Sequence, residues 1–153
     1  MEFGRSGNSK DLTMRFEDVP IVLVDDDDDD IFLLTEALRE LGYTNRLIPF
    51  TSSVDFLKYF EKDSDSHVPA ITIMDWNMPL LNGLDLLTRI NKDYPHRKIF
   101  IIILSTSRRE SDRETAMHLG AYEYYVKPTN LEGLSTFWQH IIERAKKSGL
   151  YPF

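Results

Sequence analysis

Short apolar runs alternate with longer amphipathic segments along most of this chain. The runs are Ile21–Val24, Leu47–Phe50, Ile71–Met74, Ile99–Leu104 and Tyr122–Val126. Each run is followed by a segment of helical period, and this alternation is typical of the βαβ units that build a parallel, doubly wound sheet. The pattern therefore predicts an α/β fold with five parallel strands.

Apolar residues at helical spacing predict the side of each helix that faces the core. The expected stripes are Ile31, Leu34, Leu38 and Leu41; Val54, Leu57 and Phe60 or Glu61; Leu84, Leu87 and Ile90; and Leu131, Leu134, Trp138, Ile141 and Ala145. Gly42 is the predicted C-cap of the first helix, and Ser52 or Ser53 the predicted cap of the second. The segment 107–119 has few apolar residues, so it is expected either to pack lightly and to move, or to be well anchored with a solvated outer face.

The chain ends differ in character from the segment between them. Residues 1–18 are polar and have no hydrophobic period, so we predict a flexible N-terminal arm outside the fold, with Met14 as a candidate natural start. A single domain over residues 19–148 and a short tail over 149–153 would follow. The 153 residues, 42% of them hydrophobic, are enough for one domain with a proper core.

Composition narrows the classes of function. The net charge of −7 disfavours binding to nucleic acid or to an anionic membrane surface. The sequence contains no cysteine, which excludes disulfides, thiolate metal sites and a cysteine nucleophile. No apolar run is long enough to span a membrane, and the N-terminus has no signal-peptide core, so the cytoplasm is the expected location.

Polar residues that could bind a ligand or take part in catalysis follow four of the predicted strands. Asp25 and Asp26 come after the first strand, Asp75 after the third, Ser105 after the fourth and Lys127 after the fifth. Because the carboxyl ends of parallel strands meet at one edge of the sheet, we expect these side chains to converge there. The later acids of the same run, residues 28–30, are explained by capping of the following helix and by its dipole.

Converging carboxylates repel one another unless a cation neutralises them. A site built only of oxygen ligands favours Mg²⁺, with Mn²⁺ as a substitute. Beside such an ion Asp75 becomes a plausible nucleophile toward phosphorus. The Lys127 ammonium and the Ser105 hydroxyl could then pair with the oxygens of a transferred phosphoryl group.

These residues stand in motifs that resemble the receiver domain of two-component response regulators, of the chemotaxis type. The motifs are V-D-D after the first strand, M-D-W-N-M-P-x-x-N-G around the third, L-S-T after the fourth and Y-x-V-K-P at the fifth. The resemblance runs from Pro20 to about Lys147. It implies a flavodoxin-like receiver fold whose five parallel strands have the order 2-1-3-4-5.

The resemblance also implies a role for each site residue. It makes Asp75 the phosphoacceptor, Asp25 and Asp26 the acid pair that binds metal with Asp75, Asn77 a further metal ligand through its backbone carbonyl, Lys127 the phosphate-pairing lysine, Ser105 the switch hydroxyl, and Tyr124 the aromatic that changes rotamer. A cis peptide between Lys127 and Pro128 is implied as well. One departure is Leu80, which stands where the family often has glycine.

The implied function is signalling. A sensor histidine kinase or a histidine phosphotransfer protein would donate the phosphoryl group, and the domain would catalyse only its own phosphorylation and dephosphorylation. Output to an unknown downstream protein would use the fourth helix, fifth strand and fifth helix, with Arg108, Arg109, Tyr122, Tyr124 and Trp138 near that surface. The tail S-G-L-Y-P-F is too short for a DNA-binding segment, so we expect a stand-alone regulator.

Two alternatives remain open at this point. One is a receiver-like binding module that is never phosphorylated. The other is a haloacid-dehalogenase-like phosphatase, which also phosphorylates an aspartate at a strand end. That family requires a second acid two residues after its nucleophile, and here the position is Asn77.

Overall fold

The structure is a computed structural model, and it describes residues 13–62 and 68–153. Five parallel strands form one sheet in the order β2-β1-β3-β4-β5, which confirms the predicted fold. The strands are β1 (Ile21–Val24), β2 (Leu47–Phe50), β3 (Ile71–Met74), β4 (Phe100–Ser105) and β5 (Glu123–Val126). The first three have the predicted bounds, whereas β4 and β5 each begin one residue later than predicted and β4 also includes Ser105.

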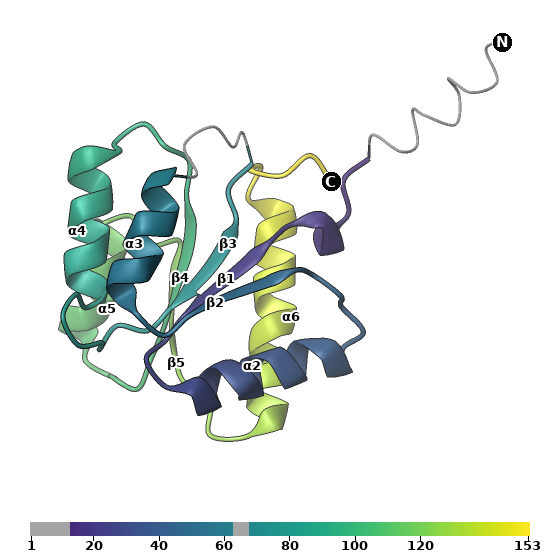
Figure 1. The fold of residues 1–153 in the computed structure, drawn as a ribbon. Coiled ribbons are helices and arrows are strands. Elements are labelled where there is room, and N and C mark those ends of the chain that lie inside the picture. Colours follow the sequence, from purple (N-terminus) through teal and green to yellow (C-terminus); the bar gives the residue numbers. More distant parts are fainter. Residues whose placement is uncertain (1–12, 63–67) are drawn as a thin grey trace, which may run out of the picture.

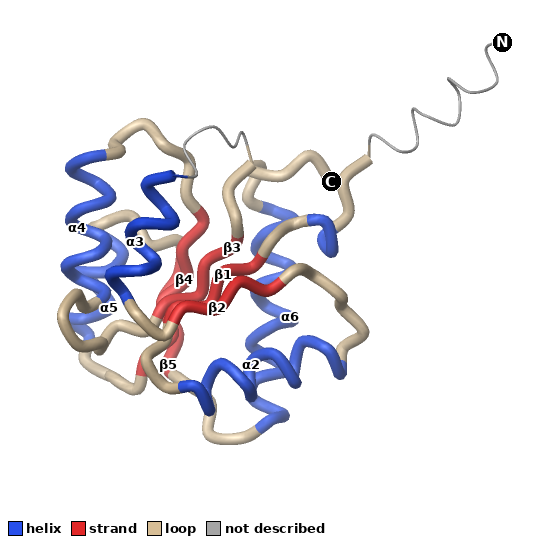
Figure 2. The backbone as a smooth tube through the Cα atoms, in the orientation of Figure 1, coloured by secondary structure: helices blue, strands red, loops and turns tan. Residues whose placement is uncertain are grey.

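Helices cover both faces of the sheet (Figure 1). The described helices are η1 (Phe16–Asp18), a short 3-10 turn, and α2 (Asp28–Glu40), α3 (Ser53–Lys62), α4 (Gly83–Asp93), α5 (Glu110–His118) and α6 (Leu131–Lys147). Figure 2 shows α3, α4 and α5 on one side of the strands and α2 and α6 on the other. None of the helices in the described ranges is long and apolar enough to cross a bilayer.

Two hydrophobic cores result, one on each face of the sheet. The central strands β1, β3 and β4 are buried along their whole length, because their alternate residues point into opposite cores. On β1, Leu23 packs with α2 and α6, whereas Val24 packs with α3 and α4. Trp138 joins α6 to α2, because its indole N–H donates to the Leu34 carbonyl at 2.9 Å.

The helix stripes were predicted correctly in most positions and wrongly in a few. Leu84 and Leu131 are 40% and 42% exposed, whereas Leu86 in the same helix as Leu84, and Phe137 in the same helix as Leu131, are buried although neither was predicted. These helices carry more apolar residues than one stripe needs, so spacing alone does not fix which of them face inward. The C-cap of α2 is Leu41, one residue before the predicted Gly42, and Gly42 follows it with the left-handed φ of 90° that favours glycine there. Ser52 caps α3, because its Oγ accepts a hydrogen bond from the Asp55 N–H at 3.2 Å.

The prediction of an arm outside the fold is wrong for Phe16. This side chain is only 4% exposed and meets the Tyr43 ring edge-on at 5.3 Å. The Asn45 amide fixes the same segment by donating to the carbonyls of Phe16 and Val19. An aromatic side chain in a polar segment can still bury its surface against a core formed by distant residues. Residues 1–12 lie outside the described ranges.

The short C-terminal tail also packs onto the domain. Tyr151 is 6% exposed and lies edge-on to Phe100, with 5.9 Å between the ring centroids. Phe153 stacks on Tyr151 and lies 6.5 Å from the Phe16 ring. The packed unit therefore extends beyond the predicted bounds of 19–148 at both ends.

Candidate functional site

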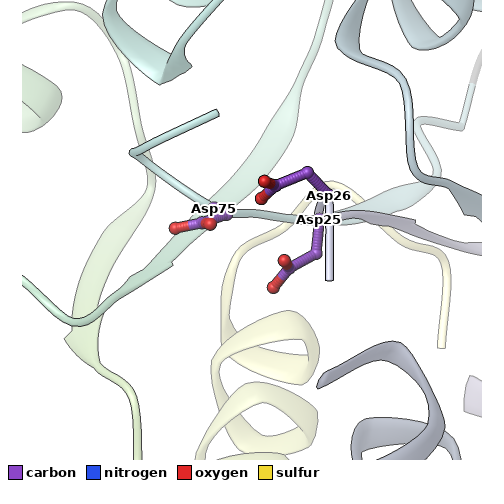
Figure 3. Close-up of side chains that lie close together, drawn as sticks. All are labelled: Asp25, Asp26 and Asp75. Atoms are coloured by element: carbon purple, nitrogen blue, oxygen red, sulfur yellow. The ribbon is translucent and has the colours of Figure 1, made fainter. Parts of the chain in front are cut away.

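Three carboxylates meet at the carboxyl edge of the sheet (Figure 3). Asp25 and Asp26 follow β1, Asp75 follows β3, and these two strands are hydrogen-bonded neighbours. One ligand oxygen from each of the three lies within 4.8 Å of the others. Asp25 and Asp75 are buried and Asp26 is exposed, so the cluster is closed on the protein side and open to solvent at Asp26.

Backbone groups orient the two buried acids. The Asp27 N–H donates to Asp25 Oδ1 at 3.0 Å, and the Asn77 N–H donates to Asp75 Oδ1 at 3.3 Å. The Asp75 N–H in turn donates to the Val24 carbonyl at 2.9 Å, which ties the end of β3 to β1. Three carboxylates, two of them held by backbone groups and none accompanied by a softer ligand, fit a hard cation such as Mg²⁺ or Mn²⁺.

Lys127 already provides one cation at this cluster. Its side chain is 15% exposed, and its Nζ lies 2.8 Å from Asp25 Oδ2, 2.7 Å from Asp30 Oδ2 and 3.6 Å from Asp75 Oδ2. Burial lowers the pKa of the ammonium, but its hydrogen bonds to Asp25 and Asp30 outweigh burial, so the pKa lies above its ordinary value. Lys127 is therefore charged throughout the physiological pH range.

One ammonium does not balance the buried acids. Burial raises the pKa of Asp75 to about 6, and the attraction of Lys127 opposes this shift while the charge of Asp25 adds to it. Burial also raises the pKa of Asp25 against its hydrogen bonds to Lys127 and the Asp27 backbone. A carboxylate that ionises reluctantly gains from a second cation, so the electrostatics of the site favour metal binding.

The predicted cis peptide before Pro128 is wrong, because the described residues contain no cis peptide bond. The Lys127 N–H donates to the Ser105 carbonyl at 2.7 Å, which extends the pairing of β5 with β4 to the strand end. The Lys127 ammonium contacts Asp25 and Asp30 although the peptide bond between Lys127 and Pro128 is trans. The trans isomer is also the intrinsically favoured one.

Ser105 and Tyr124 are joined through Ser107. Ser105 is fully buried at the end of β4, and its Oγ accepts a hydrogen bond from the Ser107 N–H at 3.1 Å. The Tyr124 hydroxyl donates to the Ser107 carbonyl at 2.8 Å, and its ring is only 2% exposed. The Arg113 guanidinium lies over that ring at 5.3 Å. The loop before α5 therefore contacts both residues for which a switching role was predicted.

The residues predicted near the output surface differ widely in exposure. Arg108 and Arg109 are exposed, and with Asn77, Ser107 and Asp112 they line a hollow of about 360 Å³. Tyr122 is half-buried and stacks on Phe100 at 4.5 Å. Trp138 is fully buried between α6 and α2, so the prediction that it lies near that surface is wrong. An indole at a helical core position gains more from burial than from exposure.

The contact of Asp30 with Lys127 was not predicted from the sequence. Capping and the helix dipole were expected to explain Asp30, but the cap is Asp27, whose carboxylate accepts from the Asp29 N–H at 2.9 Å. Asp30 instead pairs with Lys127. A signal was present, because Asp30 stands four and eight residues before the buried Leu34 and Leu38 and so shares their face of α2.

Leu80 departs from its neighbours in backbone conformation. Its φ is 67°, in the left-handed region that favours glycine, and its side chain is 85% exposed. The structure thus shows why glycine would suit this position in the loop after β3.

Comparisons with known proteins agree with this geometry. The family model described as response regulator receiver domain matches residues 21–138. Chemotaxis protein CheY1 of Helicobacter pylori is 31% identical over 108 residues, covering 71% of this chain and 84% of that protein. The structure resembles the phosphorylated cyanobacterial phytochrome response regulator RcpA, with a TM-score of 0.71, 26% identity and coverage of 83% and 93%. It also resembles the Mn²⁺-bound form of response regulator Rcp1, with a TM-score of 0.65, 26% identity and coverage of 80% and 91%.

Proposed function

This chain belongs to the response regulator receiver family of two-component signalling, and we propose that Asp75 accepts a phosphoryl group from a histidine kinase or a histidine phosphotransfer protein. The observation that carries the proposal is the position of Asp75 among Asp25, Asp26 and the Lys127 ammonium. A carboxylate in that setting can act as a nucleophile, because the charges around it can neutralise an incoming phosphoryl group.

The transfer makes one bond and breaks one. A carboxylate oxygen of Asp75 attacks phosphorus, the bond from phosphorus to the donor's imidazole nitrogen breaks, and that nitrogen keeps the electron pair and leaves. Asn77 holds Asp75 Oδ1 through its N–H, which leaves Oδ2, on the Lys127 side, for the attack. Lys127 then pairs with a phosphoryl oxygen.

Asp25, Asp26 and Asp75 would hold a bound Mg²⁺ ion, with Mn²⁺ as a substitute and the Asn77 carbonyl as a further ligand. When bound, the ion supplies positive charge that neutralises the phosphoryl oxygens and the crowded carboxylates. The Mn²⁺-bound Rcp1 structure supports this assignment by similarity.

Phosphorylation would be signalled through the loop before α5. A phosphoryl group offers new acceptors to the Ser105 hydroxyl, which is hydrogen-bonded to the Ser107 N–H in this structure. Movement of Ser105 would disturb Ser107 and, through it, the Tyr124 hydroxyl. The proposed output surface is therefore α5, β5 and α6, which correspond to the fourth helix, fifth strand and fifth helix expected from the sequence.

The proposed partners are a phosphodonor protein and a downstream protein, and the proposed setting is the cytoplasm. Family membership argues against the phosphatase alternative, because the matched family consists of signalling receivers. The alternative of a module that is never phosphorylated differs in one respect that can be measured: its Asp75 would take no phosphoryl group.

Mass spectrometry after incubation with acetyl phosphate and Mg²⁺ tests the proposal. We expect one phosphoryl adduct, on Asp75, that disappears in Asp75→Asn and on removal of the metal by a chelator. Asp29→Asn is a matched control, because it removes the same charge from an exposed side chain nearby. An adduct that persists in Asp75→Asn, or its absence from the wild-type protein, would contradict the proposal.

A further inference from the structure

Asp30 is placed to control the ammonium of Lys127. Its carboxylate lies in the first turn of α2 and contacts Lys127 Nζ at 2.7 Å, closer than Asp75 at 3.6 Å. Among the hydrogen bonds of the described residues, its side chain accepts only from Lys127. Asp30 is therefore a partner of the lysine and not a cap of the helix.

The surroundings strengthen this ion pair. Its two side chains border a small cavity of about 30 Å³ whose other lining residues are apolar: Leu33, Leu34, Leu104, Pro128 and Leu134. The Lys127 side chain is 15% exposed and that of Asp30 is 33% exposed. Ion pairs with limited access to water are screened less than those on an open surface.

The hydrogen bonds of Lys127 also hold its ammonium away from Asp75. Lys127 Nζ makes hydrogen bonds to Asp25 and Asp30 but lies beyond hydrogen-bond distance from Asp75. Pairing with a phosphoryl group on Asp75 requires the ammonium to move away from α2. The charge of Asp30 opposes this movement.

We propose that Asp30 is a positioning residue that holds Lys127 toward α2 and thereby slows phosphorylation of Asp75. This inference rests on the proposed function. Removing the Asp30 charge leaves Asp25 as the remaining close partner of Lys127 and Asp75 as the next nearest acid. The ammonium then lies closer to the position of the incoming phosphoryl group, whose oxygens it stabilises during transfer.

The first test compares initial rates of phosphorylation from phosphoramidate at saturating Mg²⁺. The Asp75 oxygen attacks phosphorus, the bond to the already protonated nitrogen of phosphoramidate breaks, and that nitrogen keeps the electron pair and leaves as ammonia. We expect Asp30→Asn to react about fivefold faster than wild type, the size of one partly exposed ion pair. Asp30→Glu keeps the charge and should restore a rate close to that of wild type.

Asp29→Asn is the matched control. It removes the same charge from the same turn of α2, but Asp29 is exposed and makes no ion pair among the described residues. Its rate should equal that of wild type. A faster reaction in both variants would show a general effect of net charge, and a slower reaction in Asp30→Asn would show that the pair assists transfer. Either result would overturn the proposal.

The second test needs neither metal nor phosphodonor. The Lys127 ammonium is partly protected from solvent, and its signal in a proton–nitrogen NMR spectrum of lysine ammonium groups is identified by its loss in Lys127→Arg. This signal should shift in Asp30→Asn and stay in place in Asp29→Asn. An unmoved signal in Asp30→Asn would overturn the proposal whatever the rates.

The two proposals fail in different ways. Absence of an adduct on the wild-type protein would overturn the proposed function and with it the role of Asp30 in transfer. A wild-type adduct formed at the same rate in Asp30→Asn and Asp29→Asn would overturn the role of Asp30 alone.

Discussion

The helices α5 and α6 flank the same strand, β5, but differ sharply in how they are held. The buried residues of α6 are Leu134, Phe137, Trp138, Ile141, Ile142 and Ala145. In α5, Ala116 is the one buried residue. Helices with few buried apolar contacts open at lower free energy than well-packed ones. The site thus lies between a firmly packed half, formed by α2 and α6, and a loosely held helix.

The attachment of α5 depends on polar contacts near its N-terminus. Its N-cap residue, Arg109, makes no side-chain cap, and the pair between Arg113 and Glu110 is exposed at 4.0 Å. Ser107 contributes more, because its hydroxyl donates to Asp112 and its carbonyl accepts from Tyr124. Because the Ser107 N–H also donates to Ser105 Oγ, the loosely held start of α5 is tied directly to the residue predicted to act as the switch.

The largest effect should come from Trp138→Ala in the firmly packed half. The substitution empties a fully buried position and removes the hydrogen bond to Leu34, so the free energy of unfolding should fall by about 3–5 kcal/mol. Urea denaturation measures this fall in the free energy of unfolding, with Trp138→Phe as the milder control. A fall of less than about 1 kcal/mol in the free energy of unfolding would show that α6 is not firmly packed.

Asp75→Asn should stabilise the metal-free protein. The pKa of Asp75 is about 6 in the fold and 3.8 in the unfolded chain, so the folded state prefers the protonated acid. This contribution is present below pH 4 and is lost as the pH rises through about 6. At pH 7.5 the substitution should therefore add about 2–3 kcal/mol, with no gain at pH 4.

Thermal unfolding at the two pH values, with and without Mg²⁺, measures this difference. Bound metal should raise the melting temperature of the wild-type protein and leave that of Asp75→Asn less affected. Equal melting temperatures for the two metal-free proteins at pH 7.5 would contradict the electrostatic account of the site.

Tyr124→Phe should weaken the attachment of α5 by a smaller amount. It removes the hydrogen bond to the Ser107 carbonyl, at a cost of about 1 kcal/mol. Hydrogen exchange should become faster in the amides of α5, while those of α6 keep their protection. Uniform acceleration in both helices would show that Tyr124 supports the whole domain and not the loop alone.

Met117→Ala should have the smallest effect. The Met117 side chain on α5 is 39% exposed, so the free energy of unfolding should fall by less than about 0.5 kcal/mol. The comparison with Leu134→Ala, which truncates a buried residue of α6, is informative because both changes remove apolar atoms from a helix beside β5. Similar losses in the two variants would contradict the difference in packing.

Most of the fold could be predicted from the sequence because the strands are largely apolar runs. The bounds of β1, β2 and β3 were predicted to the residue, since each run ends at a polar or turn-forming neighbour. Helix phases were harder to predict. Leu84 and Leu86 fit the spacing of α4 about equally well, and only packing against the sheet separates them. The burial of Phe16 depends on residues distant in sequence, including Tyr43 and Phe153.

The meeting of Asp25, Asp26, Asp75 and Lys127 could be predicted because it follows from parallel strands ending at one edge. Asp30 could not be separated from the acids beside it by type or charge. Only its phase on the helix, shared with Leu34, distinguishes it. The cis peptide expected before Pro128 rested on the resemblance alone, and the structure has a trans bond there.

The most direct test of the central claim is an NMR comparison of the protein with and without beryllofluoride and Mg²⁺, which together mimic the phosphorylated aspartate. We predict chemical-shift changes at Ser105, Ser107, Tyr124 and throughout α5, and no such changes in Asp75→Asn. Changes confined to the loop after Asp75, with residues 105–126 unmoved, would contradict the proposed coupling between the site and the loosely held helix.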